Sequence, residues 1–538
     1  MRVRRTAVVV AALAPLALTA VVAAGPARAQ NMPSACVDTA DTIAAVGSVA
    51  ADVAAGTVSI FGQTTPVDLT TLDLADPHFP DPSRALWWRS LEWLAAVYLA
   101  GTPNLPMAGS ADPIADVAAA MARHPDPGSA SRAALATANA TGWDEGTNYS
   151  RERALNCIYA LTNDDRLLPA LASTVAANKD PVRYYGPPGK QVHNHGLLAN
   201  LALIQTADLT HDPDLRAFAV ARLTLSAPKA FSPFGFTYEQ STDYHDVNVR
   251  QWSNAAAIMA ADPAVPAATN RAIAAELLAA RRIAGALIDP AGHTAAIGDS
   301  HPALVKRPTA QRTLVTRDDP GGVAVGRWSW TDPSTSWWAV RYGPAQTMHG
   351  HQDHGSILWS TLGVPVLVDP GFSTFDPTDP LTAWQKSPAA HNVAVPVADP
   401  YVRTTSRMLV LSRTGRSDTI VVQNRSWQRA VVATAVVDDA RHRLSMTQRV
   451  NANFATHLHL APGWTFHRHA GLVWTFVSRN RVLTIATTAP PRTTALLRGS
   501  TRPIGGWVLP SFGARQPANE LVLGGTGTQS LVLTVSVL

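Results

Sequence analysis

The chain has 538 residues, of which 46% are hydrophobic and 15% charged, with 40 prolines and 34 glycines. This is the balance of a globular protein long enough for two or more hydrophobic cores. The formal charge of +5 comes largely from Arg2, Arg4, Arg5 and Arg28; without them 40 basic and 39 acidic residues remain, a balance of +1. Global charge therefore does not indicate nucleic-acid or membrane binding, and a local basic cleft for an acidic ligand stays open.

The first 29 residues have the pattern of a secretory signal peptide. A basic start, "MRVRR", precedes the apolar run "TAVVVAALAPLALTAVVAA" and the small-residue site "ARA" at Ala27 to Ala29. We expect cleavage after Ala29 and secretion of the mature chain. No later segment offers about 18 uninterrupted apolar residues, so the sequence predicts no membrane span.

The two cysteines, Cys36 and Cys157, leave two interpretations open. In an exported chain they can pair and tie the N-terminal segment to a helix. Alternatively, Cys157 within "ALNCIYAL" is a small buried apolar residue.

Two kinds of hydrophobic pattern divide the chain into two domains. From about residue 84 to 288 the apolar spacing is helical, and Gly, Pro and Asp-Pro pairs are expected to end the helices. These helices predict a stack of helix hairpins, open or closed. From about residue 320 short segments rich in Val, Thr and Trp predict an antiparallel β-sandwich. We place the helical domain at residues 30–315 and the sandwich at 316–538, with a ligand cleft between them.

The segment "HGHQDH", residues 349–354, holds the most concentrated set of potential ligands. On an extended strand His349, His351 and Asp353 point to one face, and paired imidazoles suit Zn²⁺ or an acidic ligand. Asp353 and His354 can equally hydrogen-bond to nearby backbone. Further on, "LVDPG" contains Asp369, which alone is a plausible turn residue, and "SPAAHNV" places His391 at a strand start, where a histidine is often only structural.

These pieces resemble the C-terminal domain of the heparinase II/III-like polysaccharide lyases. "HGHQDHGSILWSTLGVPVLVDPGFSTF" followed by "SPAAHNVAV" matches that family's order and spacing, and "GGVAVGRW" and "AAIGDS" are smaller markers. The resemblance implies an N-terminal (α/α) toroid followed by an antiparallel β-sandwich. It also implies a structural zinc held by His351, Asp369 and His391, beside a catalytic His349.

The helical half carries two more segments that resemble the family. "VHNHGLLANLAL" supplies Asn194 and His195 at a helix entry, and "YEQSTDYH" supplies Tyr244 at another. Read alone, Asn194 is a helix cap and Tyr244 an aromatic residue packed on the core. The resemblance implies that Asn194 and His195 neutralise a substrate carboxylate. It assigns Tyr244 as acid, or as acid and base together, and His349 as its cationic support or as a base on the opposite sugar face.

The predicted function is cleavage of a uronic-acid-containing glycan by β-elimination, with an acidic polysaccharide or oligosaccharide as substrate. Two alternatives remain at this stage. "HGHQDH" also matches the metal signature of zinc-dependent hydrolases of the metallo-β-lactamase kind, although "GSILWSTLGVPVLVDPG" predicts strand, turn and strand where that fold has a helix. The second alternative is a glycan-binding protein without catalytic activity.

Overall fold

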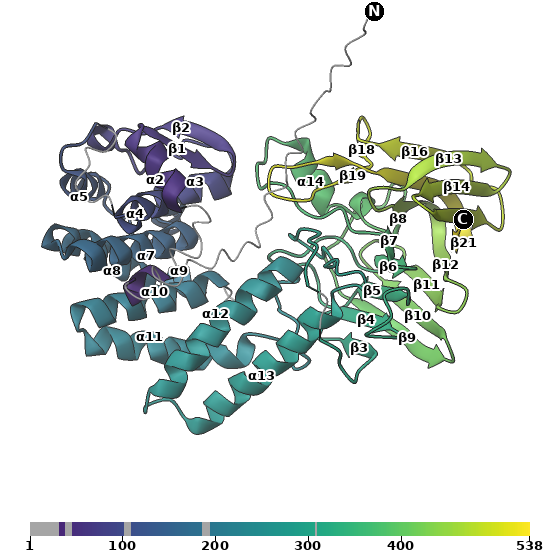
Figure 1. Cartoon of the computed structure of the whole chain (residues 1–538), viewed down its shortest axis with the longest axis horizontal. Helices are drawn as coiled ribbons and strands as arrows, with labels where there is room; N and C mark the ends of the chain where they lie inside the picture. The colour runs from purple at the N-terminus through teal and green to yellow at the C-terminus, as the bar shows by residue number, and fades with distance from the viewer. Residues whose placement is uncertain (1–31, 38–45, 102–108, 186–193, 307–308) are drawn as a thin grey trace, which may run out of the picture.

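The computed structural model describes residues 32–37, 46–101, 109–185, 194–306 and 309–538. The predicted signal peptide, residues 1–29, lies outside this range. Helices occupy the N-terminal half and strands the C-terminal half, and the two halves lie side by side (Figure 1).

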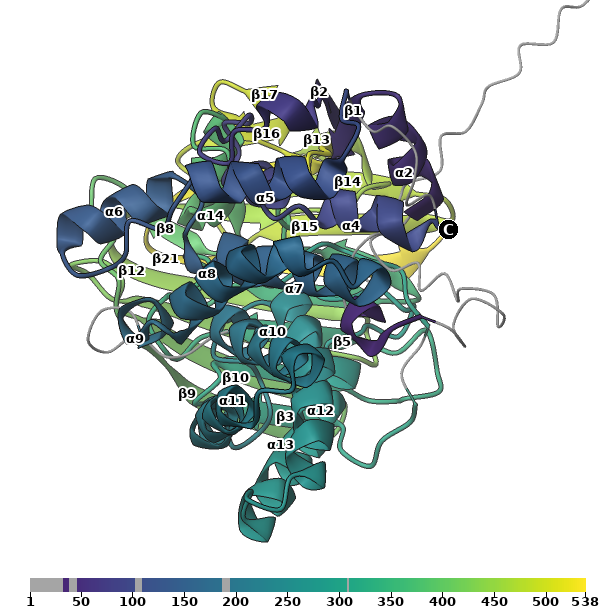
Figure 2. The same cartoon turned by 90° about the vertical axis from the view of Figure 1, so that its left-hand side faces the viewer.

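Helices of the helical half pack against one another, with α10 beside both α7 and α11 and α12 beside α13. Seen from the helical side, α5, α7, α10 and α11 lie in front of the strands (Figure 2). The helices are α2 (Val46–Ala54), α3 (Pro82–Arg89), α4 (Glu92–Leu99), α5 (Pro113–Arg123), α6 (Arg132–Ala140), α7 (Glu145–Thr162), α8 (Leu168–Lys179), α9 (Pro181–Tyr185), α10 (Asn194–Thr210), α11 (Pro213–Ser226), α12 (Thr242–Ala261), α13 (Ala267–Ala286) and, within the strand half, α14 (Pro380–Lys386).

Asp-Pro pairs occur at both ends of helices in this fold: Asp262 and Pro263 follow the end of α12, as expected, whereas other pairs begin helices. At α3, α5, α11 and α14 the aspartate caps the helix by accepting a backbone N–H, and proline follows in the first turn. The physical reason is that a first-turn residue needs no N–H and proline already has a helical φ.

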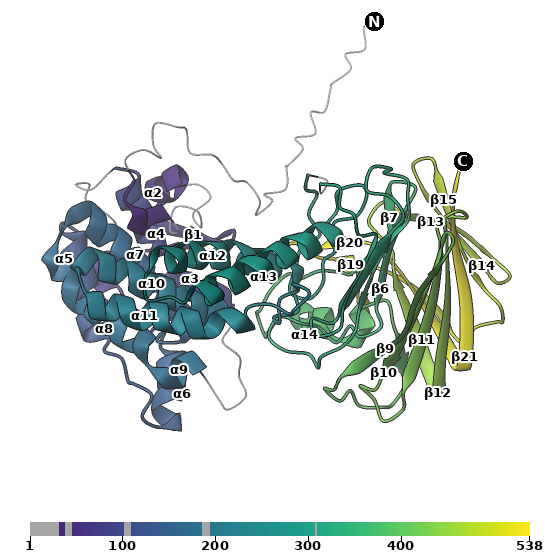
Figure 3. The same cartoon turned by 90° about the horizontal axis from the view of Figure 1, so that it is seen from below.

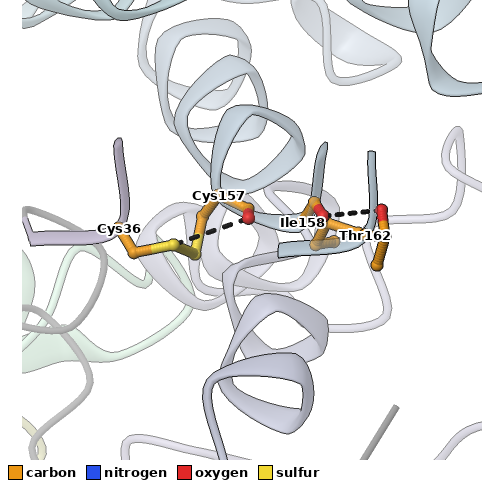
Figure 4. Close-up of a disulfide and its surroundings, with 4 residues drawn as sticks. All are labelled: Cys36, Cys157, Ile158 and Thr162. Atoms are coloured by element: carbon orange, nitrogen blue, oxygen red, sulfur yellow. Dashed lines mark hydrogen bonds between the residues drawn. A yellow bond between two sulfur atoms is a disulfide. The ribbon is translucent and has the colours of Figure 1, made fainter. Parts of the chain in front are cut away.

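A disulfide joins Cys36 to Cys157, which decides between the two interpretations of these cysteines (Figure 4). Cys36 ends the short 3₁₀ helix η1 (Ser34–Cys36), and Cys157 lies within the buried part of α7. The bond closes a loop of 121 residues, and loop closure of this size restricts the unfolded chain strongly.

Antiparallel strands form two main sheets in the C-terminal half. One has the order β3-β4-β5-β6-β7 and the other β13-β14-β15-β21-β12-β11-β10-β9, with β16 added to β21 and β8 to β12. The strands of the first sheet are β3 (Val315–Asp318), β4 (Val323–Arg327), β5 (Trp337–Arg341), β6 (Ile357–Thr361) and β7 (Val364–Leu367). Those of the second are β8 (Ala394–Pro396), β9 (Ser406–Thr414), β10 (Ser417–Asn424), β11 (Val431–Asp438), β12 (Arg443–His459), β13 (Thr465–Ala470), β14 (Val473–Ser478), β15 (Arg481–Thr487), β16 (Thr494–Arg498) and β21 (Asn519–Val537). Short pairs are β1 (Thr57–Ile60) with β2 (Gln63–Pro66), β17 (Ser500–Thr501) with β18 (Ile504–Gly505), and β19 (Trp507–Val508) with β20 (Gln516–Pro517).

The five-stranded sheet is buried on both faces. One face packs on the larger sheet through a core that includes Trp338, Trp359 and Leu521, and the other packs on α13 through Ile283 and Trp337. Side chains of β4 and β5 are therefore buried at every position, whereas β10, with one open face, alternates. Figure 3 shows the two sheets face to face, with α13 reaching toward them. The predicted helical domain followed by a β-sandwich is confirmed, and the junction between the halves is a packed interface.

None of the described helices is both long enough and apolar enough to cross a membrane.

Candidate active site

The first turn of α12 is tied to residues 297–300 and to the loop before β6. The Ser241 hydroxyl accepts the Tyr244 N–H at 3.3 Å and lies 2.9 Å from the Asp299 carbonyl oxygen, to which it can donate. The Asp299 N–H donates to the His349 carbonyl at 2.8 Å. Backbone bonds thus bring Tyr244, Asp299 and His349 together at the junction of the two halves.

Two glycines permit this close approach. Gly298 has a φ of +65°, and a Cβ there would lie 2.5 Å from the carbonyl oxygens of both Gln240 and His349. A Cβ on Gly350 would lie 2.2 Å from the Gln240 side-chain oxygen. That oxygen also accepts the Thr347 N–H at 3.0 Å, so Gln240 holds the loop that carries His349.

The Tyr244 and His349 rings stack, with centroids 3.3 Å apart and planes 8° from parallel. Burial, followed by the negative charges of Asp299 and Glu239, raises the pKa of the Tyr244 phenol well above its usual value. The phenol is therefore a proton donor at neutral pH. The His349 side chain is 16% exposed, and both residues are half-buried, so the pair is open to solvent.

Asp299 lies behind this pair and contacts both histidines of the motif. Its Oδ2 is 3.0 Å from His349 Nδ1, and its Oδ1 is 3.0 Å from His351 Nε2. The Lys386 ammonium lies 3.0 Å from Oδ1 and 3.1 Å from Oδ2. Burial alone would raise the pKa of Asp299, but the hydrogen bonds from both histidines and the Lys386 charge lower it overall.

Glu239 links the helix entry at Asn194 to His349. Its Oε1 accepts the Asn194 N–H at 3.0 Å and the Asn248 Nδ2–H at 2.7 Å, while its Oε2 is 3.6 Å from His349 Nε2. The Asn194 side-chain oxygen accepts the His195 N–H at 3.0 Å, so its NH₂ is the end suited to an anionic ligand.

The centroids of the His195 and Tyr149 rings lie 5.4 Å apart. A negative charge on Tyr149 would raise the pKa of Tyr244. The two helical-half segments singled out in the sequence meet through the Asn194–Glu239 hydrogen bond, and Glu239 lies beside His349.

His351, Asp369 and His391 form a buried group whose ligand atoms lie within 4.8 Å of one another. Asp369 Oδ2 accepts a hydrogen bond from His391 Nδ1 at 2.9 Å. Within the described part of the chain, His351 Nδ1 and His391 Nε2 are buried without a hydrogen-bond partner. Buried imidazole nitrogens rarely stay unpaired, and Zn²⁺ accepts two histidines and a carboxylate, so the residues fit a metal ion.

A second group, His457, His459 and Glu520, has similar composition but different chemistry. His457 Nδ1 lies 2.7 Å from Glu520 Oε1, and His459 Nε2 lies 3.0 Å from the Ala389 carbonyl. Glu520 Oε2 accepts the Gly506 N–H at 2.7 Å. None of these three residues has a buried polar atom without a hydrogen-bond partner in the described part of the chain, unlike His351 and His391, so this network does not require a cation.

Residues 349–353 form a loop before β6, so the expected extended strand with His349, His351 and Asp353 on one face was wrong. The fully buried Asp353 lies instead beside Arg341, with Oδ2 3.4 Å from its Nε. His354 Nε2 bonds to the Pro344 carbonyl at 2.9 Å. Both therefore have structural contacts, which was one of the interpretations left open. His391 likewise follows the 3₁₀ helix η5 (Pro388–Ala390) and lies three residues before β8.

Two residues at this site, Asp299 and Lys386, were absent from the predicted set, and Glu239 was recognised only as part of the motif that carries Tyr244. Asp299 lies in "AAIGDS" and Glu239 in "YEQSTDYH", both of which carry the family resemblance, so a signal existed for each. Lys386 precedes "SPAAHN" at the end of α14, and only the fold brings it to Asp299.

A nearby cavity of about 250 Å³ reaches Asp369 but is not lined by Tyr244 or His349.

Comparison with known proteins agrees with this fold. Residues 324–400 match the family model described as Heparinase II/III-like, C-terminal, a stretch that includes His349, His351, Asp369 and His391. No sequence among the curated proteins matches the chain.

Solved structures of lyases share the architecture. A heparinase III aligns with a TM-score of 0.68 and 12% identity over 89% of this chain and 80% of its own. A mutant heparan sulfate lyase from Pedobacter heparinus aligns with a TM-score of 0.60 and 15% identity over 91% of this chain and 83% of its own. A chondroitin AC lyase from Streptomyces coelicolor, solved with chondroitin sulphate, aligns with a TM-score of 0.53 and 12% identity over 91% of this chain and 78% of its own.

At such identities these alignments establish the fold, an (α/α) toroid followed by an antiparallel β-sandwich. The chain thus resembles the heparinase II/III-like polysaccharide lyases in sequence over residues 324–400 and in fold over most of its length, as the motifs predicted.

Proposed function

We propose that the protein is a secreted polysaccharide lyase that cleaves a uronic-acid-containing glycan by β-elimination, with the substrate held between the toroid and the sandwich. The observation that carries the proposal is the Tyr244–His349 pair, linked through Glu239 to Asn194 and through Asp299 to His351. A proton donor, a candidate base and amide donors thus converge at the junction of two domains.

In this mechanism Asn194 and His195 donate hydrogen bonds to the uronate carboxylate. The charge that develops when C5 loses its proton spreads onto that carboxylate, so donors placed there stabilise the transition state. His349 Nε2 removes the C5 proton. The C4–O bond breaks as the C4–C5 double bond forms, and Tyr244 protonates the departing oxygen.

The stacked rings support action from one side of the sugar. Atoms in contact lie about 3.5–4.0 Å apart, so a sugar between two rings needs roughly twice the observed 3.3 Å separation. This arrangement disfavours Tyr244 and His349 on opposite faces. The raised pKa of Tyr244 keeps the phenol protonated at neutral pH, which supports the role of acid for Tyr244 and of base for His349.

A Zn²⁺ ion would be held by His351, Asp369 and His391 and would supply structural rather than reactive chemistry, bracing the segments that precede β6, follow β7 and precede β8. The buried and unpaired His351 Nδ1 and His391 Nε2 support this assignment. Secretion is supported by the leader sequence and by the Cys36–Cys157 disulfide, which suits an oxidising compartment.

The decisive experiment incubates the mature protein with a panel of uronates, among them alginate, heparan-type and hyaluronan-type glycans, and records ultraviolet absorbance. A lyase creates an unsaturated uronyl end that absorbs, whereas a hydrolase gives saturated products. New reducing ends without absorbance would indicate the hydrolase, and binding without either product would indicate a glycan-binding protein. The hydrolase has little structural support, since His349, Asp353 and His354 contact Asp299, Arg341 and Pro344 and do not join His351 in one ligand set.

A further inference from the structure

Asp299 has a place in the site that neither the motif nor the proposed mechanism explains. Its side chain is fully buried, and its two oxygens meet three donors: His349, His351 and Lys386. It belongs to the connection between α13 and β3, whereas both histidines belong to the sandwich. The backbone fixes its position, since its N–H and carbonyl are bonded to His349 and Ser241.

A carboxylate that faces an imidazole nitrogen defines which nitrogen carries the proton. A neutral histidine has one N–H and one lone pair, and an ionised carboxylate can only accept. Asp299 therefore requires the proton of His349 on Nδ1 and that of His351 on Nε2. The remaining nitrogens, His349 Nε2 and His351 Nδ1, then carry the lone pairs.

These are the two atoms that the site uses. His349 Nε2 points toward Glu239 at 3.6 Å, too far for a hydrogen bond but on the side where Asn194 is held. His351 Nδ1 is the buried and unpaired nitrogen of the metal group.

We propose that Asp299 is a positioning residue that sets opposite tautomers on His349 and His351, and so couples the catalytic base to the metal group through one carboxylate. The part that concerns the base rests on the proposed function; the part that concerns the metal does not. The Lys386 ammonium contacts both oxygens and favours the ionised carboxylate, the form in which both are acceptors.

Asp299→Asn and Asp299→Ala test the coupling in the full mature chain. An asparagine offers one acceptor oxygen and turns its NH₂ toward the other histidine, so one of the two histidines loses its acceptor. With alanine both histidines lose it. Zn²⁺ affinity is measured by chelator competition and kcat and KM by product absorbance, with thermal melts to confirm folding. Asp318→Asn is the matched control, because Asp318 is also buried at the domain junction but bonds to Ser232 and the Phe236 N–H.

For Asp299→Ala we expect Zn²⁺ affinity to fall about 10–100-fold, as for other partners of ligand histidines. We expect kcat to fall about 100-fold, with KM changed less than about threefold. For Asp299→Asn at least one of the two readouts falls by a similar factor, and Asp318→Asn keeps both. The proposal is overturned if Asp299→Asn retains both, or if folded Asp299→Ala retains either one.

A tautomer measurement provides a readout that general destabilisation does not change. In zinc-free protein labelled with ¹⁵N-histidine, NMR long-range couplings distinguish Nδ1–H from Nε2–H, and His349→Gln identifies the signal of His349. We expect His349 as the Nδ1–H form in the wild type and its loss in Asp299→Ala; an Nε2–H form in the wild type overturns the proposal. If no uronate is cleaved, the proposed function fails, while the zinc and NMR readouts still decide the role of Asp299.

Discussion

The Tyr244 phenol and the His349 imidazole lie face to face, with 3.3 Å between ring centroids. Tyr244 comes from the first turn of α12 and His349 from the loop before β6, so each half of the molecule contributes one member of the pair. The loop is held on the helix through Gln240, Gly298 and Asp299. Relative movement of the two halves would therefore separate Tyr244 from His349, and the packed junction fixes their distance.

Tyr244→Phe is expected to lower kcat about 100-fold or more, because a phenyl ring keeps the stacking but has no proton to give. KM should change little, since the hydroxyl acts on the departing oxygen. Product absorbance measures both constants. Tyr159→Phe is the control: its hydroxyl bonds to Asp165, at 3.3 Å on an exposed surface, and kcat should stay at the wild-type value. More than a tenth of the wild-type kcat in Tyr244→Phe would exclude this tyrosine as the acid.

His391→Ala and His457→Ala should separate the two histidine groups. His391 supplies a buried nitrogen without a partner, whereas His457 is already bonded to Glu520. We expect His391→Ala to lose bound zinc after dialysis and to melt at a lower temperature. His457→Ala should keep its zinc. Elemental analysis and thermal melts measure this, and equal zinc content in both variants would contradict the assignment of the metal group.

The motif pieces were found in the sequence because each is local, with chemistry-bearing residues a few positions apart. The helical domain and the sandwich followed from apolar periodicity, which changes from helical to strand-like near residue 320, whereas the toroid followed from the family resemblance. The loop at His349 was misread because alternation assumes an extended backbone, whereas Met348 has a φ of +44°. Asp299 lies 50 residues from His349 in sequence, and its hydrogen bonds exist only after the toroid docks on the sandwich. No local pattern predicts such a contact.

Glu152 makes stability depend on pH. It is buried in α7 and bonds to Asn178 and Thr206, and burial raises its pKa from 4.5 to about 7. The unfolded chain releases this proton near pH 4.5, while the folded chain holds it until about pH 7. Its contribution is therefore fully present below pH 4.5 and decreases as pH rises toward 7, by a few kcal/mol at about 1.4 kcal/mol per pKa unit.

Glu152→Gln keeps the shape of the protonated acid and should remove this part of the pH dependence. Urea unfolding at pH 5 and pH 7 measures it: the wild type should lose more stability between these values than the variant. Asp208→Asn, whose carboxylate is 59% exposed, is expected to behave as the wild type. An identical pH response in Glu152→Gln and the wild type would refute the buried-acid explanation.

Gly298→Ala should damage both stability and activity, and Gly415→Ala distinguishes the two possible causes. Both glycines have a left-handed backbone, with φ of +65° and +58°, so alanine strains each by about 1–2 kcal/mol. Only at Gly298 would the new Cβ meet neighbours, at 2.5 Å from the Gln240 and His349 carbonyl oxygens; nothing lies within 4 Å at Gly415. We therefore expect Gly415→Ala to melt slightly earlier with unchanged kcat. Gly298→Ala should melt several degrees lower and lose most of its kcat, because displacing the His349 loop moves the base away from Tyr244. Equal effects of the two substitutions on kcat would show that the close approach at Gly298 does not position the site.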